Sequence, residues 1–177
     1  MLVAVPEGFE EQLAGVVGRD VSVVTGAESR SGSVANALAA VESELVVVHD
    51  AARPLAPPAL FDAVVDALAA EPGIDGIIAA APVADTLKRA AGAALDVSET
   101  VDREGLWAIQ TPQAFRADAL RQALVVGAAQ LEAATDDAML VEAGGGLVRI
   151  HPFAEPNPKV TTHADLLLAG ALLRERR

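Results

Sequence analysis

The segment LVVVHDAARPLAPPALFDAVVDALAAEPGIDGIIAAAPV, residues 45–83, contains the pattern from which the fold class follows. It opens with an apolar, β-branched run at 45–48, which is typical of a buried strand. A loop at 50–58 follows, and the helical spacing of the next apolar residues (Leu60, Val64, Val65 and Leu68) predicts a helix. A second apolar run at 76–83 predicts another strand, so the segment is a strand–helix–strand unit.

The same alternation continues on both sides of this unit. Further strands are expected at 2–5, 21–24 and 147–150, and helices at 7–17, 31–41, 117–131, 136–142 and 164–173. Such a rhythm predicts an α/β domain with a mostly parallel sheet covered by helices on both faces. We expect Pro112 to end a strand before the next helix. No repeat or linker divides the chain, so residues 1–177 are expected to form a single domain.

Residues 84–107 depart from this rhythm. Small residues at 90–94 separate two β-prone segments, which favours a pair of strands joined by a turn over a helix. We therefore expect a β-arm that projects from the sheet. For Lys88 and Arg89 we prefer the ordinary interpretation, solvated charges on the surface of a hairpin.

Composition excludes several classes of protein. The 177 residues are 52% apolar, contain no cysteine and carry a formal net charge of −12. Disulfide frameworks and thiolate metal sites are thereby excluded, and binding to nucleic acid is disfavoured. The apolar runs are too short to span a membrane, and the first residues lack the pattern of a signal peptide, so we expect no membrane partner and a cytoplasmic location.

The first candidate site follows the strand at 45–48. His49 and Asp50 come directly after it, with Arg53 three residues further on, and ligands of open α/β sheets gather at the carboxyl ends of strands. A carboxylate there can hold Mg²⁺, and a guanidinium matches phosphate oxygens. The alternative is a polar strand exit at which Asp50 only caps a turn, and both interpretations remain open.

Two other loops are less specific. The segment 25–34 is rich in small residues, and Ser33 could face a ligand, although a helix-capping loop uses the same residue types. Lys159 could bind phosphate or be an ordinary charged loop residue. A Walker A loop, an HExxH-type metal spacing and a G-x-S-x-G elbow are all missing from the sequence.

Taken in order, six motifs resemble those of the 2-C-methyl-D-erythritol 4-phosphate cytidylyltransferase family. They are Arg30–Val34 after Gly26, HDAARP (49–54), PVADTLKR (82–89), TVDREGLW (100–107), QTPQAF (110–115) and NPKVTT (157–162). The resemblance implies a Rossmann-like nucleotidyltransferase fold and a place in non-mevalonate isoprenoid biosynthesis. It implies transfer of a cytidylyl group from CTP to methylerythritol phosphate with release of pyrophosphate. It also implies Mg²⁺ or another divalent cation, and a homodimer built through the arm at 84–107, so that each site takes residues from both subunits.

The resemblance assigns roles to individual residues. Arg103, Lys159 and Asp50 correspond to catalytic residues, the first two as cations that position the substrate phosphate and Asp50 as the residue near the ribose and the metal. The substrate pocket would be lined by these two cations together with Arg53, Thr86, Thr135 and Thr161. The nucleotide would be bound by Ala27, Glu28, Ser33, Asp50 and Ala51.

Three features depart from the family's pattern. Pro158 stands where the family usually has isoleucine, and Ala27 replaces a common glycine, which requires a negative φ at that position. Nothing in residues 1–19 resembles the family's Gly-rich loop and Pro-Lys pair, which wrap the CTP triphosphate. We therefore expect a domain that lacks its first strand–loop–helix unit, binds CTP poorly and turns over little.

Two alternatives are kept. Ribitol-5-phosphate cytidylyltransferases share the HDAAR-type loop and the Gln-Thr-Pro-Gln stretch, but DTLKR and TVDREGLW together favour the methylerythritol enzyme. The other alternative is a catalytically impaired, dimerising remnant of the family.

Overall fold

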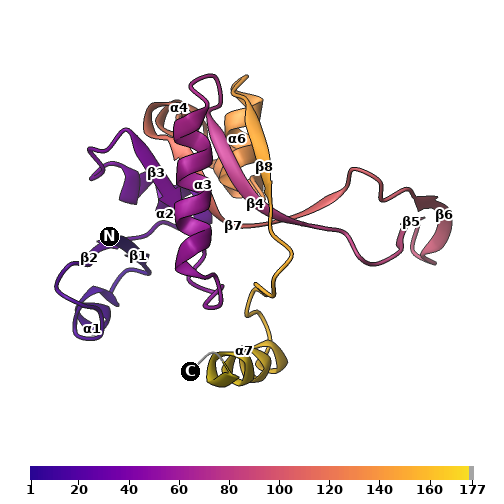
Figure 1. Cartoon of the computed structure of the whole chain (residues 1–177), viewed down its shortest axis with the longest axis horizontal. Coiled ribbons are helices and arrows are strands. Elements are labelled where there is room, and N and C mark those ends of the chain that lie inside the picture. The colour runs from indigo at the N-terminus through magenta and orange to yellow at the C-terminus, as the bar shows by residue number, and fades with distance from the viewer. Residues whose placement is uncertain (176–177) are drawn as a thin grey trace.

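A four-stranded mixed sheet forms the centre of the computed structural model, which describes residues 1–175 (Figure 1). Its strand order is β3 (Leu45–Val48), β7 (Trp107–Arg116), β4 (Gly76–Pro82), β8 (Val148–Pro152). Strands β3, β4 and β8 run in one direction, because β3 and β4 are both antiparallel to β7 and β8 is parallel to β4. A separate parallel pair is formed by β1 (Leu2–Val5) and β2 (Ser22–Thr25).

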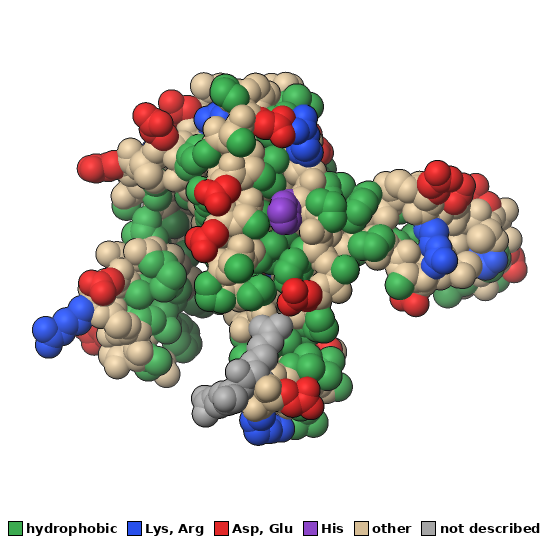
Figure 2. All heavy atoms as spheres, viewed as in Figure 1, with side chains coloured by type: hydrophobic (Ala, Val, Ile, Leu, Met, Phe, Trp, Pro, Cys, Tyr) green, Lys and Arg blue, Asp and Glu red, His purple; other side chains and the backbone are tan. Residues whose placement is uncertain are grey.

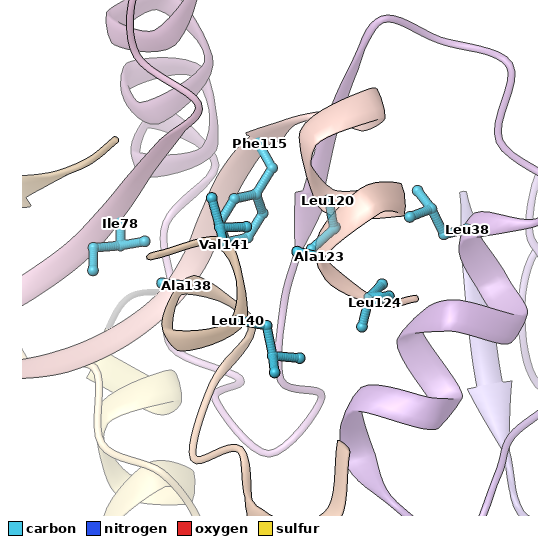
Figure 3. Packing of buried hydrophobic residues seen from close by; sticks show 9 residues of the cluster. All are labelled: Leu38, Ile78, Phe115, Leu120, Ala123, Leu124, Ala138, Leu140 and Val141. Carbon is cyan, nitrogen blue, oxygen red and sulfur yellow. The ribbon is translucent and has the colours of Figure 1, made fainter. Parts of the chain in front are cut away.

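Helices cover both faces of the four-stranded sheet. On one face, α3 (Pro58–Ala70) packs Leu60, Val64 and Leu68 against a cluster that includes Ile77 of β4. The other face carries α4 (Ala117–Ala123), α6 (Asp137–Ala143) and the end of α2 (Arg30–Leu38), gathered around Phe115 and Ile78 (Figure 3). Neighbouring residues of a strand point to opposite faces, which is why Ile77 and Ile78 belong to different clusters. The expected α/β layering is confirmed.

The predicted break at Pro112 is wrong, because β7 runs without interruption from Trp107 to Arg116. The pairing with β4 instead shifts its register: Ile109 lies opposite Ala80, whereas Gln113 lies opposite Ile78. Residues 110–112 therefore bulge out of the ladder. Proline has no N–H to donate, and a bulge is a place within a sheet where that loss is tolerated.

Two predicted helices are shorter than their sequence pattern indicated. The helix expected at 117–131 is split into α4 and α5 (Ala128–Ala133), and Gly127 adopts extended backbone angles between them. The helix expected at 7–17 is reduced to α1 (Glu10–Ala14). None of the residues of α1 is buried, and a helix this short has no packed face to stabilise it.

The arm expected at 84–107 contains an antiparallel hairpin, β5 (Leu87–Ala91) paired with β6 (Asp96–Val101). Figure 1 shows it extended well away from the sheet, at the end of the long strands β4 and β7. Its turn uses Gly92 at a φ of 71°. Nearly every residue of the two strands is exposed, so the hairpin gains little stability from packing against the rest of its own chain.

The C-terminal helix α7 (His163–Glu175) also stands apart from the sheet (Figure 1). Only Ala169 within it is buried, and hydrophobic side chains are visible on its surface in Figure 2. The exposed large hydrophobic residues of α7 are Leu166, Leu167, Leu168 and Leu173. Of the helices within residues 1–175, none combines the length and the apolar character needed to cross a bilayer.

Candidate functional site

A pocket of about 240 Å³ lies at the carboxyl end of β3, beside the bulge of β7. Because β3 ends at Val48, the chain turns there and presents Asp50 and Arg53 to this space. The loop after β8 brings in Lys159, and the first turn of α2 brings in Arg30. The lining residues are Arg30, Asp50, Arg53, Ile109, Gln110, Thr111, Gln113, Thr135, Asp136 and Lys159.

Four charged side chains form an alternating chain at this pocket. Asp50 accepts Arg30 Nε on Oδ1 at 2.9 Å and Lys159 Nζ on Oδ2 at 3.0 Å. Arg30 also donates through its Nη1 to Asp137 Oδ2 at 2.6 Å. The side chain of Asp137 is fully buried, whereas that of Lys159 is 44% exposed. The cluster thus runs from the protein interior to the pocket surface with its charges alternating in sign.

The surroundings set the protonation of these groups. Partial burial works toward a higher pKa for Asp50, but the hydrogen bonds from Arg30 and Lys159 outweigh it and hold that pKa below its ordinary value. Burial raises the pKa of Asp137 despite the neighbouring Arg30. For Arg30, burial opposes the charge, yet Asp137 and Asp50 raise its pKa further above neutrality. Arg30 is therefore a permanent cation, and Asp50 is ionised throughout the physiological range.

A hydrogen-bond network behind the pocket fixes the turn after β3. The Thr111 hydroxyl accepts the Asp50 N–H at 3.0 Å and lies 3.0 Å from His49 Nδ1, while His49 Nε2 lies 3.1 Å from the Arg53 carbonyl oxygen. A carbonyl can only accept, so Nε2 is assigned the proton and Nδ1 accepts from Thr111. Burial lowers the pKa of His49, in agreement with this neutral tautomer. His49 is a structural residue that aims Asp50 and Arg53.

Asn157 attaches the loop of Lys159 to the rest of the site. Its buried amide donates to the Thr111 carbonyl oxygen at 2.9 Å and to Gln110 Oε1 at 3.0 Å. The backbone carbonyl oxygen of Asn157 accepts Arg53 Nη1 at 2.7 Å. The loop is held a second time by the Val160 N–H, which donates to the Ala52 carbonyl oxygen at 2.7 Å. Although Pro158 removes a donor from this loop, Lys159 reaches Asp50.

Four of the predicted site residues line this one pocket: Asp50, Arg53, Thr135 and Lys159. Ala51 follows Asp50 in the turn. Thr86 and Arg103 are not part of the lining; both are exposed at the base of the arm, where Arg103 donates to the Ala84 carbonyl oxygen. Neither Thr86 nor Arg103 therefore lines the pocket of its own chain.

Thr161 is engaged in a helix cap. Its N–H and hydroxyl donate to Asp165 Oδ2 at 3.0 and 2.9 Å, and the Thr162 N–H donates to the same oxygen at 2.8 Å. The Thr162 hydroxyl in turn accepts the Asp165 N–H at 3.2 Å, which completes a capping box at the start of α7. These bonds, led by the Thr161 N–H, lower the pKa of Asp165 to about 2.

The loop before α2 is folded tightly onto the helix. The Ser33 hydroxyl accepts the Ala27 N–H at 2.9 Å, and the Ser29 hydroxyl caps the helix by accepting the Gly32 N–H at 3.0 Å. A Cβ on Gly26 would lie only 2.9 Å from Ser33 Oγ, so this position requires glycine. Ala27 is outside the left-handed region, as its substitution for glycine requires. Glu28 is exposed beside it.

Sequence reasoning missed the residues that organise the pocket. Arg30 was recognised only as part of a motif, and Asp137, Thr111 and Asn157 were given no role. Arg30 and Asp137 are 107 positions apart, so no local pattern could pair them. One clue in the sequence was Arg30 itself, because a cation placed directly after a loop of small residues can contribute to a site.

The described residues offer few ligands for a metal ion. Within residues 1–175, no group of three or more histidine, aspartate or glutamate side chains could enclose one. Asp136 lines the pocket, but its two oxygens accept the Met139 N–H and the Gln113 amide. Asp50 is the remaining carboxylate, and its two oxygens accept Arg30 and Lys159. If Lys159 leaves its oxygen, this single carboxylate fits Mg²⁺, which usually binds one or two carboxylates and takes its other ligands from phosphates and water.

Comparison with known proteins places the chain among cytidylyltransferases. The family model for 2-C-methyl-D-erythritol 4-phosphate cytidylyltransferase matches residues 1–175. A protein of that name from Deinococcus radiodurans is 46% identical over 172 residues, which cover 97% of this chain and 70% of that protein. Another, from Frankia casuarinae, is 46% identical over 175 residues, which cover 98% of this chain and 64% of that protein. The chain thus spans between 64% and 70% of the length of these two relatives.

Solved structures agree with the sequence comparison. The crystal structure of 2-C-methyl-D-erythritol 4-phosphate cytidylyltransferase from Thermus thermophilus superposes with a TM-score of 0.82 at 34% identity, covering 98% of this chain and 81% of that one. The 4-diphosphocytidyl-2C-methyl-D-erythritol synthase of Anaerococcus prevotii gives a TM-score of 0.83 at 28% identity, with 98% and 78% covered.

Proposed function

Because this chain belongs to the 2-C-methyl-D-erythritol 4-phosphate cytidylyltransferase family, we propose that it transfers the cytidylyl group of CTP to 2-C-methyl-D-erythritol 4-phosphate. Pyrophosphate would be released, and the product would serve isoprenoid precursor synthesis. Since the substrates of this reaction are a nucleotide and a small sugar phosphate, we also propose a cytoplasmic location.

One observation carries this proposal: three cations meet at one pocket of a strongly acidic chain. Arg30, Arg53 and Lys159 line it, although the whole chain has a formal net charge of −12. Asp50 and Asp137 compensate Arg30. Within residues 1–175, the Arg53 side chain has only carbonyl partners and Lys159 is partly exposed, so these last two cations can meet a small phosphorylated ligand. Arg53 Nε and Gln113 Oε1, both buried, lack a hydrogen-bond partner among the described residues, and a water, an ion or a ligand at the pocket would satisfy them.

The proposed reaction asks the protein to position and neutralise charge. The phosphate of methylerythritol phosphate is already an anion, so its oxygen can form the new bond to the α-phosphorus of CTP while the bond to pyrophosphate breaks. No protein nucleophile is needed. Lys159 and Arg53 would hold the attacking phosphate, and the rigid turn after β3 would keep both in place. A Mg²⁺ ion bound at Asp50 would add neutralisation of the nucleotide phosphates.

We extend the proposal to a homodimer in which the arm of one chain completes the pocket of the other. Thr86 and Arg103 lie at the base of an arm that extends away from its own body (Figure 1). The arm carries exposed apolar side chains, Leu95 at 71% and Val97 at 62%, and an isolated hairpin is only marginally stable in water. A second copy would bury this surface.

A pyrophosphate-release assay with CTP and methylerythritol phosphate tests the reaction, with ribitol 5-phosphate as the competing acceptor. We expect Lys159→Met to lower the turnover about a hundredfold or more, because it removes one positioned charge from the reacting phosphate. Arg19→Met, which removes the same charge from an exposed position outside the pocket and the arm, is the control. Preference for ribitol 5-phosphate would identify the other substrate, and no turnover by the wild-type chain would identify a non-catalytic member of the family.

Mixing two inactive variants tests the shared site. Arg103→Ala and Lys159→Met chains should each be nearly inactive alone, whereas a heterodimer of the two has one pocket with both cations. Activity that reappears on mixing supports the dimer. No recovery, with a monomeric mass from light scattering, would contradict it.

A further inference from the structure

The ion pair between Asp50 and Lys159 joins two groups that serve different ligands. Asp50 is the carboxylate available to a divalent cation, and Lys159 is the most exposed of the cations available to a phosphate. We propose that Asp50 and Lys159 block each other in the free protein by forming this ion pair. A phosphate that binds Lys159 frees Asp50 for a divalent cation, and a divalent cation that binds Asp50 frees Lys159 for a phosphate. The proposal rests on the function proposed above. It adds a reason why the site would bind a phosphate or a metal ion weakly when the other ligand is absent.

The geometry identifies Lys159 as the partner that can leave. Its Nζ meets Asp50 Oδ2 at 3.0 Å, and its side chain is 44% exposed. Arg30, which holds the other oxygen of Asp50, is anchored at 2.6 Å to the buried Asp137. A lysine ammonium on a flexible stem also exchanges partners more readily than a guanidinium bound to two carboxylates.

The backbone that carries Lys159 does not need to move. The amide of Asn157 fastens the loop on one side of Lys159, and the Val160 N–H bonds to Ala52 on the other. Both anchors are independent of the ion pair. Exchange is therefore a rotation of one side chain between Asp50 and a phosphate oxygen.

Charge makes the two binding events interdependent. When a phosphate takes Lys159, one oxygen of Asp50 loses its cation and becomes available to a metal ion. When a metal ion takes Asp50, Lys159 is released to bind an anion. Each ligand must therefore raise the affinity for the other by the same factor, because coupling between binding sites is reciprocal.

The test measures the binding of one ligand at a time, which removes any direct contact between metal and phosphate. Binding of Mn²⁺ alone is followed by electron paramagnetic resonance, and binding of inorganic phosphate alone by phosphorus NMR. Lys159→Met should bind Mn²⁺ about two- to fivefold more tightly than the wild type, because Asp50 is no longer occupied. Asp50→Asn should bind phosphate more tightly by a similar factor, because Lys159 is no longer occupied, and should lose Mn²⁺.

Matched variants separate this effect from the change in net charge. Arg19→Met and Asp62→Asn remove the same charges from exposed positions outside the pocket and the arm, and they should leave both affinities unchanged. Equal or weaker Mn²⁺ binding by a folded Lys159→Met chain would overturn the proposal. If Asp50→Asn does not fold, this Mn²⁺ measurement decides alone. Tighter single-ligand binding in both variants without cytidylyl transfer would support the exchange and count against the reaction instead.

Discussion

Replacing Asn157 with alanine tests how the pocket is assembled, because this side chain joins the Lys159 loop to β7. The Asn157 side chain is 3% exposed and donates two hydrogen bonds, to the Thr111 carbonyl oxygen and to Gln110 Oε1. Gln110 lies at the pocket and can turn to water, so its bond is worth about 1 kcal/mol. Thr111 is buried, and leaving its carbonyl oxygen without this donor costs about 1–3 kcal/mol.

Together these losses predict that Asn157→Ala lowers the free energy of unfolding by about 2–4 kcal/mol. With a urea slope of about 2 kcal/mol per molar, the unfolding midpoint should fall by about 1–2 M. Equilibrium urea unfolding, followed by the fluorescence of the one tryptophan and by circular dichroism, measures this shift.

The neighbouring Glu155→Ala is the matched control. Glu155 is exposed on the same loop, and its replacement should change the free energy of unfolding by less than about 0.5 kcal/mol. If Asn157→Ala unfolds within that same margin of the wild type, the two hydrogen bonds do not hold the loop and our account of how Lys159 is positioned is wrong.

Three further results are expected. Phe115→Ala should lower the free energy of unfolding by about 3–5 kcal/mol in urea titrations, because this ring is fully buried between β4 and α4, whereas Val125→Ala at an 84% exposed position should have little effect. The pKa of His49 is lowered in the folded chain, so its contribution to stability is present above the ordinary pKa of about 6.5 and is lost as the pH falls below that value. The urea midpoints at pH 7.5 and 5.5 should therefore differ less in His49→Gln than in the wild type. An unchanged difference between the two midpoints would contradict this. Asp165→Ala should speed amide hydrogen exchange at Thr161 without lowering global stability, and protection that persists would show that the capping box does not hold the start of α7.

Several features could be predicted from the sequence because their causes are local. Apolar spacing in 45–83 is enough to place β3, α3 and β4, since each element is selected by the period of its own hydrophobic residues. The hairpin in the arm was also predictable, because small residues and a turn lie between two β-prone segments. Where no tertiary contact supports a pattern, as in α1, the local prediction was too long.

The motifs likewise identified part of the site. Asp50, Arg53, Thr135 and Lys159 were named from separate segments, and they line one pocket. Their grouping could be expected because strand exits meet at one edge of a sheet. Their partners could not, because the hydrogen bonds of Asn157 and Thr111 depend on a bulge that sequence reasoning had taken for the end of a strand.

Most of the elements, the family and several of the chemical groups that the pocket offers follow from the order of residues along the chain. Which of those groups neutralise one another depends on the packed fold. Arg30 lies 20 positions from Asp50 and 107 from Asp137, and it pairs with both because a buried carboxylate must be compensated by whichever cation the packing of the elements brings near. That requirement is a property of the folded interior, so no local pattern in the sequence expresses it.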